Sequence, residues 1–226
     1  MPERDLLSGY AAWSQTYDTQ NNGLIDLEQP VMDEILAKIP PGRALDAACG
    51  TGRHARALAV RHHVVGIDQS DEMLAVACAG VPDATFERGN FNALRFDDGS
   101  FDVVVCSLAL THVEDVAPPI AEFARVVREG GRVVLSDIHP MSVMTLGQAF
   151  FSEGDGNFAF VRNRVHMVSS YLAAFRAAGL SVLDCIEARI PADPRFGGPA
   201  GQVLPEACVQ ATEGLPFVLI WELEKN

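Results

Sequence analysis

The chain has 226 residues, enough for one large domain, or for a domain with a small lid, and either can bury a full core. Hydrophobic residues make up 48% of it, which favours a compact α/β protein over a disordered one. The formal net charge is −13, from 30 acidic against 17 basic residues, and no Lys/Arg cluster offers a stripe for nucleic-acid phosphates. We therefore expect no nucleic-acid partner.

The five cysteines are odd in number and show no CxxC spacing, so we expect free thiols in a reducing compartment. The first residues lack the basic region and apolar run of a signal peptide. No uncharged run is long enough to cross a bilayer. These features predict a cytoplasmic protein without a membrane span, which acts as a monomer or homodimer.

The first predicted element is an amphipathic helix, Glu28–Ile39, and after it short apolar runs alternate with helical patterns. The predicted strands are Ala44–Ala48, Val64–Asp68, Thr85–Arg88, Phe101–Ser107 and Arg132–Asp137. The predicted helices between them are Gly52–Arg61, Asp71–Ala79 and Pro118–Val127. Several of the strands are apolar on both faces, which is typical of parallel sheets covered by helices. The alternation predicts a doubly wound α/β sheet.

The second half of the chain has a different character. Residues 139–163 show no clear period but many Phe, Gly and Met. A helix is predicted at Val165–Ala178 and a strand at Ser181–Ile190, followed by a Pro/Gly-rich stretch and a last strand at Phe217–Glu224. A strand that returns by a long loop without a crossover helix favours an antiparallel pair at the sheet edge. The two irregular stretches are expected at the same end of the sheet, where they could wall a pocket.

The stretch ALDAACGTGRHARAL, residues 44–58, has the pattern of a strand, a glycine-rich turn and a helix. Gly50 and Gly52 permit unusual backbone angles and close approach of a ligand to the chain. A dinucleotide fingerprint would have a third glycine, where this turn has alanine. Asp46 before the glycines would repel a pyrophosphate but suits an ammonium group, and Asp68 ends the next strand, where an acid can bind ribose hydroxyls. S-adenosylmethionine, a nucleoside with an amino-acid tail and no phosphate, fits both acids.

Further motifs follow in order, and together they resemble the class I S-adenosylmethionine-dependent methyltransferases, in particular the small-molecule group similar to the ubiquinone and menaquinone enzymes. LDAACGTG resembles the first motif of that family and GIDQS the second. GNFNALRFDDGSFDVVVCSLALTHV resembles the third and fourth, and VREGGRVVLSD the turn into the fifth strand. The resemblance implies that the cofactor is bound by the lid residue Tyr17 and by Asp46, Ala48, Gly50, Gly52, Asp68, Gln69, Met73, Asn90, Phe91 and Ser107. Asn90 stands where the family usually has Asp.

The N-terminal GYAAWSQTYD resembles the lid helix of the same family, although the spacing of its aromatic residues also fits simple packing. The expected fold is thus a Rossmann-like, doubly wound sheet of seven strands, the last one antiparallel, with an N-terminal helical lid and a small insertion after strand five. One methyltransferase domain would span residues 1–226, with the lid in 1–40, the cofactor-binding core in 41–138 and the acceptor side in 139–226.

The expected substrate pocket is mainly apolar, which indicates a small, mostly hydrophobic acceptor that is methylated on oxygen, nitrogen or carbon. Its expected residues are Tyr10, Trp13, Leu110, Met141, Met144 and Phe150. Arg162 and Arg164 would be available to an acceptor with a carboxylate, but a solvated helix start is the preferred interpretation of these arginines.

Two histidines follow strands at the end where parallel sheets bind ligands, His112 after the fourth strand and His139 after the fifth. Either is a candidate catalytic base for a phenol or enol acceptor, and for other nucleophiles both would only shape the pocket. Only Asp137 and His139 approach the spacing of metal ligands, and no metal is expected.

Other classes of function remain open. A methyltransferase-like fold can bind the cofactor and catalyse cyclisation or another reaction without methyl transfer. A nicotinamide oxidoreductase is disfavoured by the missing third glycine and by Asp46. A nucleic-acid methyltransferase is disfavoured by the acidic charge and by the lack of the Asn/Asp-Pro-Pro-aromatic tetrad. A protein methyltransferase stays possible, because an acidic groove could accept Lys or Arg.

The second motif supplies a direct test. Because Asp68 is expected to hold the ribose, Asp68→Ala should sharply weaken binding of S-adenosylmethionine and leave the fold intact. Calorimetric titration beside a circular dichroism spectrum measures both properties. A variant that binds as well as the parent would show that the second motif is wrongly assigned.

Overall fold

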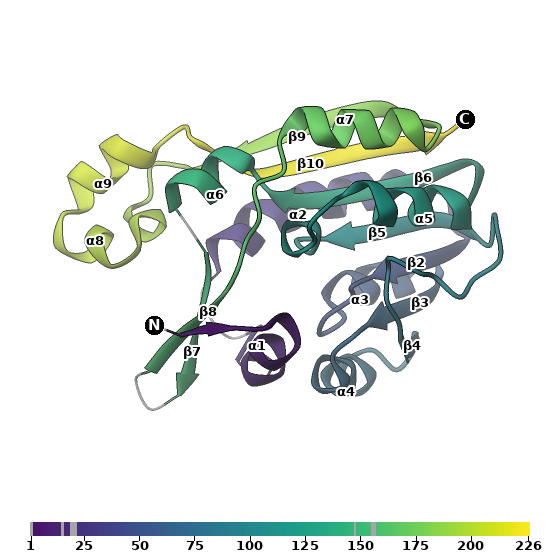
Figure 1. Ribbon diagram of the computed structural model, residues 1–226, viewed down its shortest axis with the longest axis horizontal. Helices are drawn as coiled ribbons and strands as arrows, with labels where there is room; N and C mark the ends of the chain where they lie inside the picture. Colours follow the sequence, from purple (N-terminus) through teal and green to yellow (C-terminus); the bar gives the residue numbers. More distant parts are fainter. Residues whose placement is uncertain (1, 15, 19–21, 147, 155–156) are drawn as a thin grey trace.

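A computed structural model describes residues 2–14, 16–18, 22–146, 148–154 and 157–226. The main sheet has seven strands in the order β4-β3-β2-β5-β6-β10-β9 (Figure 1). In that order the strands are Thr85–Arg88, His63–Asp68, Arg43–Ala47, Phe101–Ser107, Val127–Ile138, Pro216–Lys225 and Leu180–Arg189. Strands β2 to β6 are mutually parallel, and β10 runs antiparallel to both of its neighbours. The predicted seven-stranded sheet with an antiparallel last strand is therefore confirmed.

The strand order reverses between β2 and β5, so the crossovers on the two sides of this point turn in opposite directions. Such a reversal leaves a crevice at the carboxyl ends of the strands, where doubly wound proteins bind their ligands. Residues Ala44, Leu45 and Asp46 pair with Val103 to Val105 across the reversal. The glycine-rich turn after β2 and the segment after β5 are thus brought to the same edge of the sheet.

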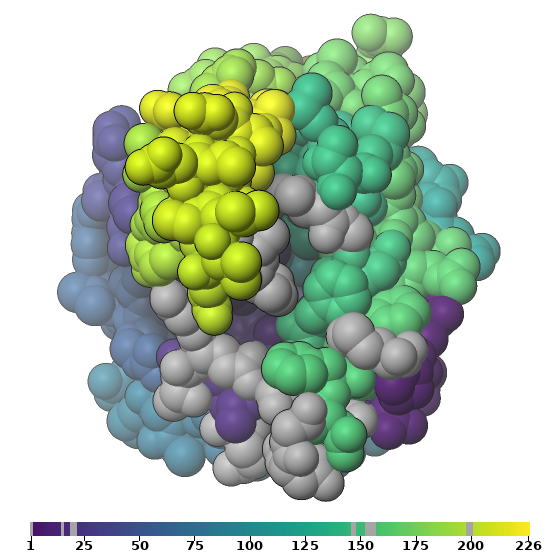
Figure 2. All heavy atoms as spheres, turned by 90° about the vertical axis from the view of Figure 1, so that its left-hand side faces the viewer, coloured from purple at the N-terminus to yellow at the C-terminus, as the bar shows by residue number. Residues whose placement is uncertain are grey.

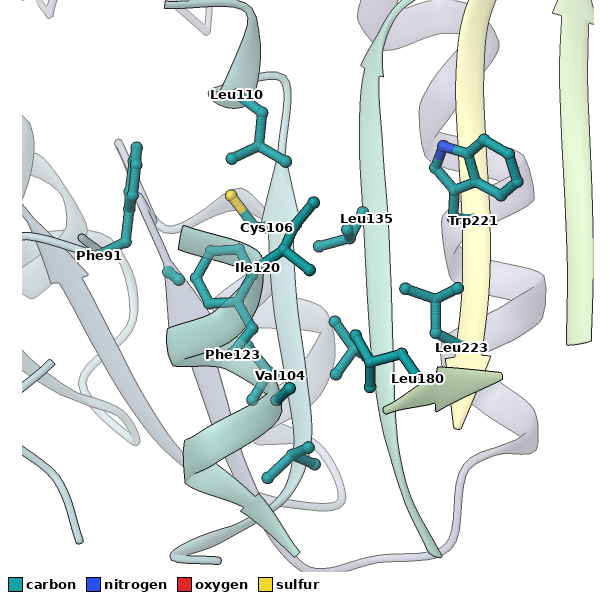
Figure 3. Close-up of a cluster of buried hydrophobic side chains, with 14 of the residues drawn as sticks. Phe91, Val104, Cys106, Leu110, Ile120, Phe123, Leu135, Leu180, Trp221 and Leu223 are labelled. Carbon is teal, nitrogen blue, oxygen red and sulfur yellow. The ribbon is translucent and has the colours of Figure 1, made fainter. Parts of the chain in front are cut away.

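Helices cover both faces of the sheet (Figure 1). They are α2 (Gly23–Lys38), α3 (Arg53–Ala59), α4 (Asp71–Gly80), α5 (Ala117–Val126) and α7 (Val168–Ala177). Helices α2 and α3 pack on one face, and α5 and α7 pack on the other in a larger apolar cluster. Figure 3 shows Phe123 of α5 and Trp221 of β10 among the buried side chains of that cluster. Helix α4 packs along β3 and β4.

The stretch without a clear period forms α6 (Pro140–Leu146) and a hairpin of β7 (Ala149–Gly154) and β8 (Asn157–Val161). The N-terminal β1 (Glu3–Arg4) adds to β8 as a parallel strand and leads into α1 (Leu6–Trp13). These strands form a second, three-stranded sheet that the sequence did not predict. The apolar side of the hairpin packs against α1. A lid helix and an insertion after the fifth strand of the main sheet, β6, are therefore both present as expected.

The Pro/Gly-rich stretch before β10 is not a simple loop, because it forms η2 (Pro194–Gly197), α8 (Gly198–Val203) and α9 (Pro205–Thr212). In Figure 1 these helices, α6 and the hairpin all lie beyond the carboxyl ends of the parallel strands. Figure 2 views this end directly, with α9 in yellow and the chain after β6 in green on the same face. Among the described residues, no helix has the length and apolar character needed to cross a membrane.

The α5 face of the core gives a stability prediction. Phe123 is fully buried, and its ring centroid lies 6.2 Å from that of Phe91. Phe123→Ala should lower the free energy of unfolding by about 3–5 kcal/mol, which is roughly 6–20 °C in melting temperature for a chain of this size. Phe158→Ala is the matched control, because that ring is 54% exposed and its loss should change little. Equal melting temperatures for the two variants would contradict the packing described.

Candidate functional site

A cavity opens at the carboxyl ends of β2, β3 and β5 beneath α1. The predicted site residues that line it are Tyr10, Tyr17, Ala48, Gly50, Asp68, Gln69, Met73, Phe91, Ser107 and His112. Leu6, Leu7 and Leu108 add apolar surface. Ligand sites in proteins are typically apolar clefts with a few fixed polar groups. The structure therefore brings residues from both halves of the sheet to one cavity.

The turn after β2 owes its shape to positive φ angles. Gly50 has φ +53°, and a Cβ atom added there would meet nothing within 4 Å. The turn thus leaves open space against the backbone at the cavity. Gly52 has φ +83°, and a Cβ there would lie 3.3 Å from atoms of Ala77, Val81 and Phe86. Gly52 serves the packing of α3 against α4 and β4 and does not line the cavity.

Asp68 ends β3 with its carboxylate held in one orientation. One oxygen accepts a hydrogen bond from the Gly50 backbone N–H at 2.9 Å, and the other accepts from the Ser70 N–H at 2.9 Å. Burial raises the pKa of Asp68. Each carboxylate oxygen can accept a second hydrogen bond, so the group can receive the hydroxyls of a ligand. Asn90 lies outside the cavity lining, between Gly89 and Phe91, which line it.

Asp46 does not line the cavity but lies buried under the turn, at 1% exposure. Its Oδ2 atom is buried with no hydrogen-bond partner among the described residues. This burial raises the pKa of Asp46 to about 6, although the nearby His54 and Arg53 lower it in part. A buried carboxylate of this kind is costly to ionise unless a positive group approaches it.

Glu28 of α2 is the central polar residue that the sequence analysis missed. Its carboxylate is fully buried and accepts from His54 Nε2 at 3.0 Å, Ser136 Oγ at 2.7 Å, and Arg53 Nη1 and Ser107 Oγ at 2.5 Å each. Burial alone would raise its pKa, but the hydrogen bonds and charges of His54 and Arg53 hold the pKa of Glu28 well below its ordinary value.

A signal for this cluster did exist in the sequence. Glu28 precedes Met32 by four residues and Ile35 by seven, so it falls on the buried stripe of α2. An acid on an apolar stripe needs buried partners. The partners come from α3, β5 and β6, and only the folded chain brings them together.

His112 lies at the end of the short helix η1 (Leu110–His112), and each of its ring nitrogens has a hydrogen-bond partner. Its Nδ1 lies 3.0 Å from the carbonyl oxygen of Arg162, which can only accept, so Nδ1 carries the proton. Burial lowers the pKa of His112, so the ring is neutral and Nε2 is an acceptor. The hydroxyl of Tyr10 donates to Nε2 at 2.8 Å. The lone pair of Nε2 is thus directed at a hydroxyl in the cavity wall.

His139, the other candidate base, has a different role in the structure. Its Nδ1 accepts from the backbone N–H of Met141 at 3.2 Å, at the start of α6. The proton must then be on Nε2, which lies 3.2 Å from the carboxylate of Glu187 and donates to it. His139 is 7% exposed and lies outside the cavity lining. Its geometry is that of a residue that fixes a helix start.

The remaining predicted pocket residues lie outside the lining of this cavity. Trp13 stacks on Phe151 of the hairpin with ring centroids 5.4 Å apart, and Leu110 is fully buried in the core. Met141, Met144 and Phe150 are exposed at 39%, 60% and 49%. The lid aromatics Tyr10 and Tyr17 line the cavity.

The fold is that of the class I S-adenosylmethionine-dependent methyltransferases, and the chain belongs to that family. A family model described as a methyltransferase domain matches residues 45–135. A demethylmenaquinone methyltransferase of Clavibacter sepedonicus is 31% identical over 179 residues, which are 75% of this chain and 71% of that protein. The resemblance of the sequence motifs is thereby confirmed.

Other matches are shorter or more distant. The uncharacterised methyltransferase YcgJ of Bacillus subtilis is 36% identical over 101 residues, which are 42% of this chain and 40% of that protein. The chain spans about half or less of the length of most curated relatives that it matches.

Solved structures agree in fold. That of an S-adenosylmethionine-dependent methyltransferase from Mesorhizobium loti has a TM-score of 0.67 at 24% identity and covers 90% of this chain and 100% of that one. The [4+2]-cyclase SpnF has a TM-score of 0.68 at 20% identity over 97% and 94% of the two chains. At these identities the likeness shows the fold alone.

The buried Asp46 predicts a pH-dependent stability. Because its folded-state pKa of about 6 lies above the unfolded value, the folded protein holds a proton that the unfolded chain releases. The free energy of unfolding should therefore fall by about 3 kcal/mol as pH rises from about 4 to about 7. Asp46→Asn should lack this part of the fall, whereas Asp83→Asn in a surface turn should follow the parent. Urea unfolding curves from pH 4 to 8 measure the difference, and parallel curves for parent and Asp46→Asn would contradict the account.

Proposed function

We propose that the chain binds S-adenosylmethionine in the cavity and transfers its methyl group to a small, mostly hydrophobic acceptor. The observation that carries this proposal is the pairing of Asp68 with the open backbone at Gly50. The carboxylate would receive the ribose hydroxyls, and the space beside Gly50 would admit the amino-acid tail. Met73 and Phe91 offer apolar surface for the adenine. Family membership supports the same cofactor.

Bound S-adenosylmethionine supplies an electrophilic methyl group that passes to the acceptor as the carbon–sulfur bond breaks, which leaves S-adenosylhomocysteine. The protein contributes chiefly alignment and exclusion of water, and such positioning can be worth roughly 7–11 kcal/mol. Helix α1 covers the cavity with Leu6, Leu7 and Tyr10, which suits the exclusion of water. Asp46 lies under the turn as a buried carboxyl group whose Oδ2 atom has no hydrogen-bond partner among the described residues, and an ammonium group nearby would favour its ionised form.

For an acceptor hydroxyl, His112 is the group that would remove the proton. Its Nε2 atom accepts a hydrogen bond from a phenolic O–H, that of Tyr10. An acceptor hydroxyl in place of Tyr10 would give its proton to Nε2 as its oxygen bonds to the methyl carbon. The Arg162 carbonyl at Nδ1 keeps the ring in the tautomer that this step requires. We assign the base role to His112 and a structural role to His139.

The acceptor class rests on the apolar walls and on the charge of the chain. Leucines and aromatic rings make up much of the cavity lining, which suits a small apolar molecule better than a polar polymer. A net charge of −13 disfavours nucleic acid as the acceptor. The alternative is a cofactor-binding protein that catalyses cyclisation or another reaction without methyl transfer, since an enzyme named as a cyclase shares the fold.

Turnover separates these two functions. The purified chain is incubated with S-adenosylmethionine labelled in the methyl group and with a panel of phenolic, quinol and lipid-like acceptors. Labelled acceptor and an equal amount of S-adenosylhomocysteine are the expected products. Binding of the cofactor without formation of S-adenosylhomocysteine from any acceptor would favour the non-methylating alternative.

The role of His112 gives a kinetic prediction for an acceptor hydroxyl. His112→Gln should lower kcat by about 10²–10⁴-fold while the affinity for S-adenosylhomocysteine stays the same. The parent rate should rise with pH through the lowered pKa of His112, because only the neutral ring takes a proton. His63→Gln, at an exposed position, is the control and should leave kcat unchanged. An unchanged kcat in His112→Gln would refute the assignment of the base.

A further inference from the structure

A second concave surface adjoins the cofactor cavity and shares Leu6 and His112 with it. This groove is lined by residues of β1, the start of α1, η1 and the end of β8, and by Arg162 and Arg164 in the chain that follows β8. His112 lines both the cavity and the groove. A molecule with one end in the groove could therefore extend past His112 to the cavity, where Tyr10 meets Nε2.

Hydrogen bonds hold the backbone of Arg162 and Arg164 at fixed positions relative to His112. Nδ1 of His112 donates to the carbonyl of Arg162, and the backbone N–H of Arg164 donates to the carbonyl of Thr111 at 2.7 Å. Arg162 and Arg164 line the groove on either side of Asn163, which is buried at 7% exposure. This alternation is that of an extended chain with one face turned to the groove. The segment that carries the two arginines is thus hydrogen-bonded to the segment that carries the base.

The groove is unusual for so acidic a chain. Its lining has three arginines against two carboxylates, Glu3 and Asp5, although acids outnumber bases by 30 to 17 in the whole sequence. Outside the lining, the carboxylate of Glu114 accepts from Nη2 of Arg164 at 3.1 Å. The carboxylate of Glu3 binds Arg162 through two hydrogen bonds, Nε to Oε1 and Nη2 to Oε2, each 2.9 Å. This is the paired geometry by which a guanidinium recognises a carboxylate.

The N-terminal segment thus places one side chain at Arg162 and another at His112. Glu3 offers a carboxylate to Arg162, and Tyr10 offers a phenol hydroxyl to Nε2 of His112. An ion pair between side chains as exposed as Glu3 and Arg162, at 44% and 59%, adds little stability and exchanges easily. The carboxylate of Glu3 can therefore be replaced on Arg162 by that of a ligand, whereas a ligand hydroxyl can take the place of Tyr10 only if α1 moves.

We propose that the methyl acceptor is a hydroxyaromatic carboxylic acid, whose carboxylate replaces Glu3 on Arg162 and whose hydroxyl replaces Tyr10 at His112. The inference rests on the proposed function and narrows its acceptor class. Arg162 is the specificity-determining residue. The prediction that these arginines stand at a solvated helix start is wrong, because α7 begins only at Val168 and both arginines line a groove.

Calorimetric titration in the presence of saturating S-adenosylhomocysteine tests the proposal. The probes are para-hydroxybenzoate, para-hydroxyphenylacetate and para-hydroxyphenylpropionate, each beside its uncharged amide. At least one acid should bind the parent about two- to fivefold more tightly than its amide, as expected for a carboxylate paired with an exposed guanidinium. Arg162→Gln should abolish this preference. Glu3→Gln should raise the affinity for the acid about two- to fivefold, because the internal competitor is lost.

Arg189→Gln is the matched control, since that side chain is also 59% exposed and lies on β9, outside the groove lining. It should keep the preference of the parent for the acid. Equal binding of acid and amide, no binding of any acid, or a preference that survives in Arg162→Gln would overturn the proposal while S-adenosylhomocysteine still binds. Failure of S-adenosylhomocysteine itself to bind would instead overturn the proposed function, and this inference with it.

Discussion

The fully buried carboxylate of Glu28 is the interaction on which the architecture of the site depends. It joins α2 to the first residues of α3 and to the carboxyl ends of β5 and β6 through Arg53, His54, Ser107 and Ser136. Removing one partner of such a buried charge costs about 3–5 kcal/mol, because the other is left uncompensated. The network therefore fixes Ser107 at the cavity and anchors the helix that follows the glycine-rich turn. In this way a polar cluster beneath the cavity determines the geometry above it.

Above that network, each polar group of the cavity is oriented by backbone atoms of another element. Asp68 is held by the N–H groups of Gly50 and Ser70, and His112 by the carbonyl of Arg162. The N-terminal segment then closes the site, with β1 paired to β8 and Tyr10 bonded to His112. The same segment that excludes water also presents groups resembling those of the proposed acceptor. Entry of that acceptor and displacement of the segment would therefore be one event.

Local patterns were enough to predict the main sheet. Strands such as Phe101–Ser107 are apolar on both faces, and the glycine-rich turn carries its own backbone requirement, so their positions follow from residues close in sequence. The hairpin of β7 and β8 was missed because its stability comes from contacts with α1, far away in the chain. The division of roles between His112 and His139 depends on which carbonyl, N–H or carboxylate faces each ring nitrogen. No spacing in the sequence contains that information.

The central claim is that the cavity beneath α1 binds S-adenosylmethionine. The most direct measurement is the melting temperature of the chain with S-adenosylmethionine, S-adenosylhomocysteine and NAD in parallel. A ligand at one hundred times its dissociation constant adds about 2.7 kcal/mol of stability, which is a rise of roughly 5–10 °C for a chain of this size. The account predicts this rise with the two adenosyl ligands and none with NAD. A rise with NAD alone would contradict it, because the turn at Gly50 and the carboxylate of Asp68 would then hold a dinucleotide.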